Sequence, residues 1–172
     1  SPGPAGVALL TDRVRALAPD APRCHPLSRL DHDVTGVVLY ALTPRAIDVA
    51  TRARAEGRYA RGYVAVLCAT PSPASGRWSD PIGVDPRRPE RRLAGRGRDP
   101  QPAASRYEVT RALQGGACVV ALTPETGRTH QLRVHASAHG CAVAGDPLYG
   151  GARRVVRDDG AVVPAGRVML HA

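Results

Sequence analysis

The chain has 172 residues, 43% hydrophobic and 23% charged, which is enough for an ordinary globular domain and excludes an intrinsically disordered chain. Its net charge of +9 favours a partner rich in phosphates, although all 24 cationic residues are arginine, a bias equally typical of a genome-wide composition preference. The apolar runs are too short to cross a bilayer and no charged-then-apolar segment opens the chain, so a cytoplasmic protein without membrane contact is expected.

The first elements are predicted from turn-forming residues, helix-capping residues and apolar runs. Residues 1–28 are rich in Pro and Gly around a short helix at 11–18, which Thr11 could cap. The run GVVLYAL, residues 36–42, is typical of a largely buried strand. Because aromatic residues make up only 3% of the chain, the core is expected to consist of Val, Leu and Ala.

A helix and a strand follow with clear signals. Thr43 at the N-cap, Pro44 at the first helical position and Gly57 beyond the end predict a helix between them. The run RYARGYVAVLCA, residues 58–69, predicts a strand with Tyr63, Ala65 and Leu67 on one face.

The second half is expected to be strand-rich as well. Residues 105–113 and 117–124 predict a hairpin, and residues 127–140 predict a helix that Gly140 ends in the left-handed conformation. GDPLYGG, residues 145–151, is predicted to be a turn. The order of elements indicates an α+β fold in one domain, with a mixed, mainly antiparallel sheet flanked by helices and loops.

One segment carries an unusual density of arginine. This segment comprises residues 85–102, DPRRPERRLAGRGRDPQP. Because prolines and glycines interrupt it, it is predicted to be an exposed loop without regular structure. It is either a solvated connection or a flexible arm that grips phosphates, in which case its binding would depend strongly on salt. The arginines expected to meet phosphates are Arg87, Arg88, Arg91 and Arg92.

Neither the cysteines nor the histidines indicate a metal site. Cys24, Cys68, Cys118 and Cys141 are widely spaced, so buried reduced thiols are favoured over a zinc site or a disulfide framework. His135 and His139 have helical spacing but no accompanying glutamate. We expect no metal and no cofactor.

The stretch HPLSRLDHDVTG contains two carboxylates, Asp31 and Asp33, near an arginine and two histidines and just before a predicted strand. A polar turn would explain this pattern, and so would a carboxylate that reacts with a substrate.

Several segments together resemble the RluA/RsuA-like pseudouridine synthases. SRLDHDVTG resembles their Arg-Leu-Asp motif, RYARGYVAV resembles their Tyr-containing strand, and TGRTHQLRVHASA with the following GDPLYG resembles their later Arg-containing segment. DPIGVDPRRPERR and the final RVMLHA are similar to the RluA-type branch. Ser28, Arg61 and the pair Val34-Thr35 depart from the usual residues without removing a reactive group.

The resemblance implies an isomerase that converts uridine in rRNA or tRNA to pseudouridine, acting as a monomer. It makes Asp31 the nucleophile, which would attack either C1′ or the uracil ring, with Asp33 as the competing carboxylate. It makes Arg133 the cation beside Asp31, so Arg133→Leu is expected to lower activity by several orders of magnitude with a modest loss of stability. The family's opening strand and last strand, and any S4-type domain, are expected to be missing from residues 1–172.

The resemblance implies further contacts with the RNA. Tyr63 would stack on the target base, and Arg29 would enter the stack that the uridine leaves. Arg128, His130 and Gln131, in the motif that also holds Arg133, are expected to bind RNA or substrate. A non-catalytic RNA-binding module and a carboxylate-dependent hydrolase remain as alternatives, and the hydrolase would require a second acid at a fixed distance.

Overall fold

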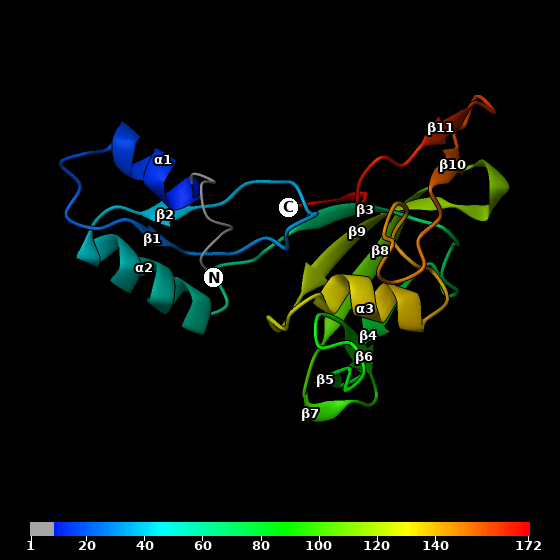
Figure 1. Cartoon of the computed structure of the whole chain (residues 1–172), viewed down its shortest axis with the longest axis horizontal. Coiled ribbons are helices and arrows are strands. Elements are labelled where there is room, and N and C mark those ends of the chain that lie inside the picture. The colour runs from blue at the N-terminus through cyan, green and yellow to red at the C-terminus, as the bar shows by residue number, and fades with distance from the viewer. Residues whose placement is uncertain (1–8) are drawn as a thin grey trace. The chain divides into compact units, whose positions relative to one another are not determined.

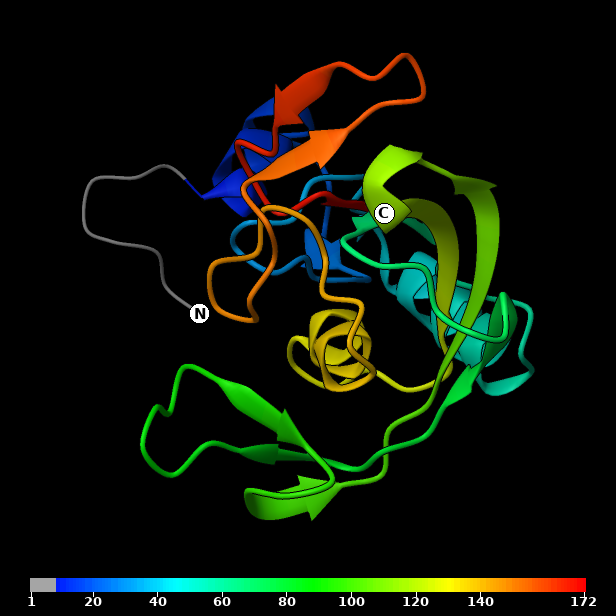
Figure 2. The same ribbon diagram turned by 90° about the vertical axis from the view of Figure 1, so that its right-hand side faces the viewer.

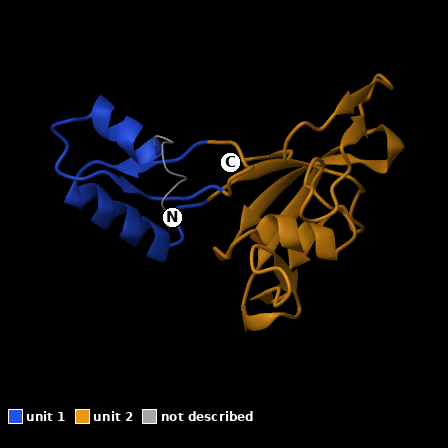
Figure 3. Cartoon of the chain, in the orientation of Figure 1, with its two compact units in different colours: residues 1–30, 37–60 blue, residues 31–36, 61–172 orange. Residues whose placement is uncertain are grey.

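A computed structural model describes residues 9–172 in two compact units, which Figure 3 distinguishes by colour. One unit contains residues up to 30 together with 37–60, and the other contains 31–36 together with 61–172. The Pro- and Gly-rich residues 1–8 lie outside the described part. Within residues 9–172, no helix combines the length and apolar character needed to span a bilayer.

The first unit contains two helices and a short strand pair: α1 (Leu10–Leu17), β1 (His25–Pro26), β2 (Tyr40–Ala41) and α2 (Pro44–Ala55). The prediction for α2 is confirmed, because the Thr43 hydroxyl accepts the Ala46 N–H at 3.1 Å and Gly57 has a φ of 69°. The predicted cap of α1 is wrong, since this helix follows Leu9 and Thr11 lies in its first turn.

The predicted strand at 36–42 is largely wrong. Only Tyr40–Ala41 pairs, because its antiparallel partner β1 has just two residues. Val37 and Leu39 are 66% and 49% exposed, so the apolar run is not buried.

The second unit is built on a five-stranded sheet in the order β12-β3-β9-β8-β4, with every pair antiparallel. Its strands are β3 (Tyr63–Leu67), β4 (Ser75–Trp78), β8 (Ser105–Ala112), β9 (Cys118–Pro124) and β12 (Leu170–His171). The predicted hairpin is confirmed as β8 and β9, joined through the short 3-10 helix η1 (Gln114–Gly116). An isolated parallel bridge joins Thr35 to His171. The α+β prediction is confirmed.

The arginine-rich segment is not irregular, which corrects the prediction for residues 85–102. It contributes β6 (Arg92–Ala94) and β7 (Arg98–Gln101), which pair on either side of β5 (Ile82–Val84). Close packing of the backbone requires glycine at two places, since a Cβ at Gly97 would lie 2.7 Å from the Val84 carbonyl oxygen and a Cβ at Gly83 in β5 would lie 2.6 Å from the Arg96 carbonyl oxygen. Glycine therefore permits this small sheet, although the prolines and glycines of the sequence had predicted a loop.

Helix α3 (Gln131–Ala138) packs against β8, β9 and β6, as Figure 1 and Figure 2 show. It is shorter than the predicted helix at 127–140, because residues 127–130 form a turn before it, but Gly140 ends it with a φ of 75° as expected. The buried side chains of the sheet include Leu67, Val120 and Leu122, which confirms the Val, Leu and Ala core. A final hairpin, β10 (Arg154–Val156) with β11 (Val162–Pro164), follows the predicted turn at 145–151.

All four cysteines are free thiols. Cys118 and Cys141 are buried as predicted, whereas Cys24 and Cys68 are partly exposed, contrary to prediction. Burial raises the pKa of the Cys141 thiol to about 11, so this side chain is a neutral core residue.

Candidate active site

Residues 31–36, which carry Asp31, are held by the C-terminal strand of the second unit. The Thr35 N–H donates to the Leu170 carbonyl at 3.4 Å, and the Ala172 N–H donates to the Thr35 carbonyl at 3.0 Å. The Thr35 hydroxyl lies 2.9 Å from His171 Nδ1. Gly36 follows with a φ of 140°, and a Cβ there would lie 2.5 Å from the Ala172 nitrogen, so only glycine fits this approach. The Asp31 segment is therefore fixed through both backbone and side-chain bonds.

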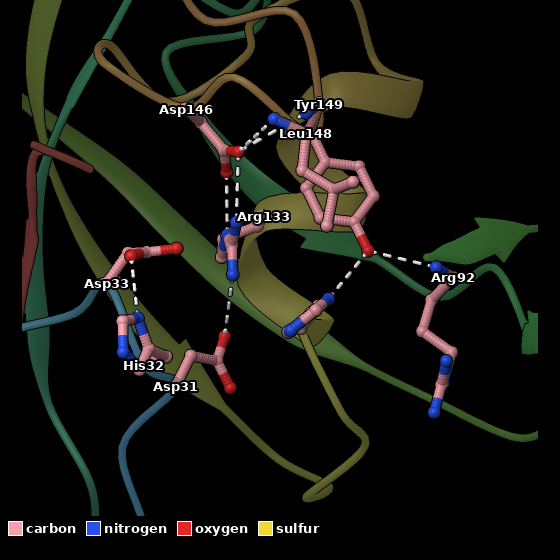
Figure 4. A network of polar contacts seen from close by, with 9 residues as sticks. Asp31, His32, Asp33, Arg92, Arg133, Asp146, Leu148 and Tyr149 are labelled. Atoms are coloured by element: carbon pink, nitrogen blue, oxygen red, sulfur yellow. Dashed lines mark hydrogen bonds and ion pairs between the residues drawn. The ribbon is translucent and has the colours of Figure 1, made fainter. Parts of the chain in front are cut away.

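The centre of the site is a guanidinium group between two carboxylates (Figure 4). Arg133 on α3 is 2% exposed and donates from Nε and Nη2 to the two oxygens of Asp146, at 2.6 and 3.0 Å. Its remaining nitrogen, Nη1, donates to Asp31 Oδ2 at 3.4 Å. Burial tends to lower the pKa of Arg133, but the hydrogen bonds and charge of Asp146, with a smaller contribution from Asp31, raise it above the ordinary value. Arg133 is thus a permanent buried cation facing Asp31.

Asp146 anchors this arrangement from the other side of the guanidinium. It is completely buried, and its Oδ1 also accepts the N–H groups of Leu148 and Tyr149, at 3.1 and 3.2 Å. Its oxygens are therefore engaged in holding Arg133 and the turn. Asp31, by contrast, keeps 26% of its side chain exposed, so it is the carboxylate of the pair that a substrate can reach.

A second set of contacts surrounds Tyr149, whose ring lies 5.2 Å from the Arg133 guanidinium carbon. Its hydroxyl accepts the Arg92 backbone N–H at 2.9 Å and lies 2.8 Å from His130 Nδ1. Burial raises the pKa of Tyr149 to about 12 and lowers the pKa of His130. Both rings are therefore neutral at pH 7 and beside the Arg133 cation.

The structure brings several predicted RNA-binding residues into this region and gives others an internal role. Gln131 is buried, and its amide bonds Thr126, Arg128 N–H, the Ala104 carbonyl and Ser105, so it holds the turn and has no group left for the direct RNA contact that was expected. Arg128 is exposed, although its Nε donates to the Pro102 carbonyl at 3.0 Å.

The four arginines that were expected to meet phosphates separate into two pairs. Arg87 and Arg88 are exposed, and Arg88 pairs with Glu90 at 2.9 Å. Arg91 and Arg92 are partly buried beside Tyr149, and the guanidinium carbon of Arg91 lies 5.8 Å from that ring. The second pair thus belongs to the surroundings of Arg133, which the sequence did not indicate.

Tyr63 and Arg29 occupy different environments. Tyr63 begins β3, is partly buried, and shares the face of Ala65 and Leu67 that α3 covers. Arg29 is exposed and belongs to the first unit.

The competing carboxylate, Asp33, pairs with His32, whereas the ion-pair partners of Arg133 are Asp31 and Asp146. Its Oδ1 is 2.9 Å from Nδ1 of His32, whose side chain is 98% exposed. Of the two carboxylates, the structure therefore places Asp31 against the buried cation. Among residues 9–172, no three His, Cys, Asp or Glu side chains are grouped as metal ligands would be.

Sequence reasoning missed two members of the site, Asp146 and Tyr149. Their segment GDPLYGG was predicted to be a turn and was matched to a family motif, but neither Asp146 nor Tyr149 was given a role. An aspartate in a turn that follows an arginine-bearing helix was the available signal.

Comparisons with known proteins agree on one family. A family model described as RNA pseudouridylate synthase matches residues 3–138. The dual-specificity RNA pseudouridine synthase RluA of Escherichia coli (strain K12) is 35% identical over 154 residues, which cover 89% of this chain and 66% of the relative. The uncharacterized RNA pseudouridine synthase YjbO of Bacillus subtilis (strain 168) is 36% identical over 148 residues, 86% of this chain and 48% of the relative.

A solved structure shows the same relationship. Human RNA pseudouridylate synthase domain containing 1 is 31% identical, with a TM-score of 0.73 over 95% of this chain and 66% of that one. The chain thus spans slightly less than two thirds of the length of this protein and of the E. coli relative, and about half of the B. subtilis one.

Proposed function

Because the chain belongs to the RNA pseudouridylate synthase family, in its RluA-type branch, we propose that it isomerises uridines in structured RNA to pseudouridine with Asp31 as the nucleophile. The observation that carries this proposal is the contact of Asp31 with Arg133, a buried cation that Asp146 fixes on its other side. An ionised carboxylate that is both oriented and accessible is what nucleophilic catalysis requires.

The reaction needs little more than this carboxylate and a held base. The N1–C1′ bond breaks, the uracil turns, a C5–C1′ bond forms, and the hydrogen on C5 leaves as a proton while N1 gains one. A carboxylate can form an adduct and leave again. Arg133, whose charge does not depend on pH in the working range, lies against the Asp31 carboxylate as its counter-ion.

The RNA itself would be held by charge. Arg87 and Arg88 are exposed in the turn before β6, and they are the side chains of this segment best placed to meet phosphates. Tyr63, on the face of β3 that α3 covers, is proposed to contact the target base. One relative is named as a dual-specificity RNA pseudouridine synthase, so more than one class of RNA should be tested here. The two classes that the sequence resemblance implied, rRNA and tRNA, are the first candidates.

The test is tritium release from unmodified tRNA and rRNA transcripts labelled at C5 of uridine. Wild-type protein should release tritium, Asp31→Asn should release none while keeping RNA affinity, and Asp33→Asn is the matched control that should keep the wild-type rate. Turnover by Asp31→Asn would remove Asp31 from this role. RNA binding without tritium release by wild-type protein would instead indicate a non-catalytic RNA-binding module. A covalent adduct with RNA containing 5-fluorouridine, seen by gel retardation, would support the enzyme.

A further inference from the structure

His130 has a backbone conformation that side chains other than glycine rarely adopt. Its φ is 57°, in the left-handed region. Among residues 9–172, Asp99 is the only other residue besides glycines with a positive φ. Such conformations persist where surrounding contacts hold them and are frequent at functional sites. The ring of His130 is held by Tyr149, with Nδ1 at 2.8 Å from the hydroxyl and the two rings edge to face.

The hydrogen bonds of Tyr149 fix the proton of the His130 ring. The Tyr149 oxygen accepts the Arg92 backbone N–H, and it stays protonated because burial raises its pKa to about 12. The buried phenol proton needs an acceptor, and within residues 9–172 the only acceptor at hydrogen-bond distance from this hydroxyl is His130 Nδ1. Nδ1 is therefore the acceptor, so a neutral ring carries its proton on Nε2, which points away from the hydroxyl.

The surroundings decide what Nε2–H would meet. The charged groups whose fields reach His130 are Asp31, Arg133, Arg92 and Asp146, and burial keeps the ring neutral among them by lowering its pKa. Asp146 is fully occupied by Arg133 and two backbone N–H groups. A phosphate beside Asp31 would be repelled by its carboxylate. The neutral Nε2–H donor of His130 therefore suits a neutral acceptor of the substrate. The carbonyl oxygens of the uracil base are acceptors of this kind.

We propose that His130 contacts the substrate uracil, donating from Nε2 to one of its two carbonyl oxygens and so holding the base at Asp31. This inference rests on the proposed function. When the N1–C1′ bond breaks, the electron pair left on N1 spreads onto the uracil oxygens, so the same hydrogen bond strengthens as the bond breaks. Tyr149 then acts through His130 as a positioning residue that sets which nitrogen carries the proton.

The test uses the transcript that wild-type protein converts, prepared with uridine, with 2-thiouridine or with 4-thiouridine. Sulfur accepts hydrogen bonds more weakly than oxygen, so one thio-transcript should react more slowly when His130 donates to that position. Single-turnover rates are measured at saturating protein by nucleoside digestion and chromatography with mass detection. His130→Asn removes the donor at the Nε2 position, and asparagine accepts the left-handed backbone.

We expect His130→Asn to be about 10- to 100-fold slower than wild type on uridine, the effect of removing one hydrogen bond to a desolvated group. The penalty for the sensitive thio-transcript, about tenfold in wild type, should shrink to within about twofold in the variant. His130→Gly, which fits this backbone best, should behave alike and covers the case in which the asparagine variant fails to fold. His139→Asn, at the other end of α3, is the matched control and should keep the wild-type ratios among the three transcripts.

Equal thio-penalties in wild type and both His130 variants would overturn the contact while leaving the proposed function intact, because wild type still converts the uridine transcript. If wild-type protein converts no transcript, the proposed function fails and this inference fails with it.

Discussion

Replacing Arg133 by leucine would leave a buried carboxylate without its cation. Asp146 has no exposed surface, and Arg133 supplies two of the hydrogen bonds to it. Removing one partner of a buried ion pair costs about 3–5 kcal/mol, whereas domains of this kind are stable by about 5–15 kcal/mol. We therefore expect Arg133→Leu to reduce the free energy of unfolding by about 3 kcal/mol or more. This reduction is larger than the modest one that the sequence suggested, because the sequence did not indicate Asp146.

The double variant Arg133→Leu/Asp146→Asn separates the effect of the orphaned charge from that of altered packing. Its asparagine oxygen can still accept the N–H groups of Leu148 and Tyr149, but no charge remains buried. It should be about 2 kcal/mol more stable than Arg133→Leu, although both variants should be inactive because Asp31 no longer has its cation.

The assay is urea denaturation followed by the fluorescence of Trp78, the single tryptophan of the chain, which is 3% exposed and reports on the second unit. A destabilisation below about 1 kcal/mol for Arg133→Leu, the size of a surface ion pair, would refute this account. A double variant no more stable than the single one would refute it as well.

Three further variants or treatments test other features. Arg87→Gln/Arg88→Gln should weaken RNA binding and flatten the slope of log K against log[salt] by about 0.7–0.9 for each phosphate that is no longer neutralised. The single-turnover rate should not change. An unchanged slope would mean that both side chains are solvated and do not contact phosphates. Cys141, with a pKa of about 11, should react with iodoacetamide far more slowly at pH 8 in native than in urea-unfolded protein, as peptide mass mapping would record, and equal rates would contradict its burial. Gly36→Ala should lower the free energy of unfolding by about 1–3 kcal/mol and reduce activity strongly, because the added Cβ would collide with the Ala172 backbone. A variant that reacts at the wild-type rate would show that the Asp31 segment tolerates displacement.

Local signals in the sequence were sufficient where local hydrogen bonds decide the structure. Thr43, Pro44 and Gly57 defined α2 because capping and left-handed residues act within one turn. The prediction for the run at 36–42 failed for the opposite reason, since an apolar pattern does not say how long the partner strand is. In the arginine-rich segment, Gly97 serves close packing against β5, which its neighbours in sequence do not reveal.

The site could be predicted only in part from the residues. Asp31 and Arg133 are 102 positions apart, and no periodicity relates them; the family resemblance, not the physical pattern, placed them together. The same resemblance gave no environment for Gln131, whose burial accompanies four hydrogen bonds that form only when β8 and the turn at 126–130 meet. Contacts of this kind depend on the whole second unit.

The dependence of residues 31–36 on β12 has a consequence for the order of events during synthesis. The bonds of Thr35 to Leu170, His171 and Ala172 join the early part of the chain to residues that the ribosome adds more than a hundred positions later. Since domains emerge from the ribosome from the N-terminus onward, helix α3 and the sheet strands β3, β8 and β9 can all form before this tether exists. Asp31 therefore acquires its fixed position only after residues 170–172 have emerged. In a nascent chain whose residues 170–172 are still inside the ribosome, the Arg133–Asp146 pair could be in place. The Asp31 carboxylate, which faces this pair, would not yet be fixed.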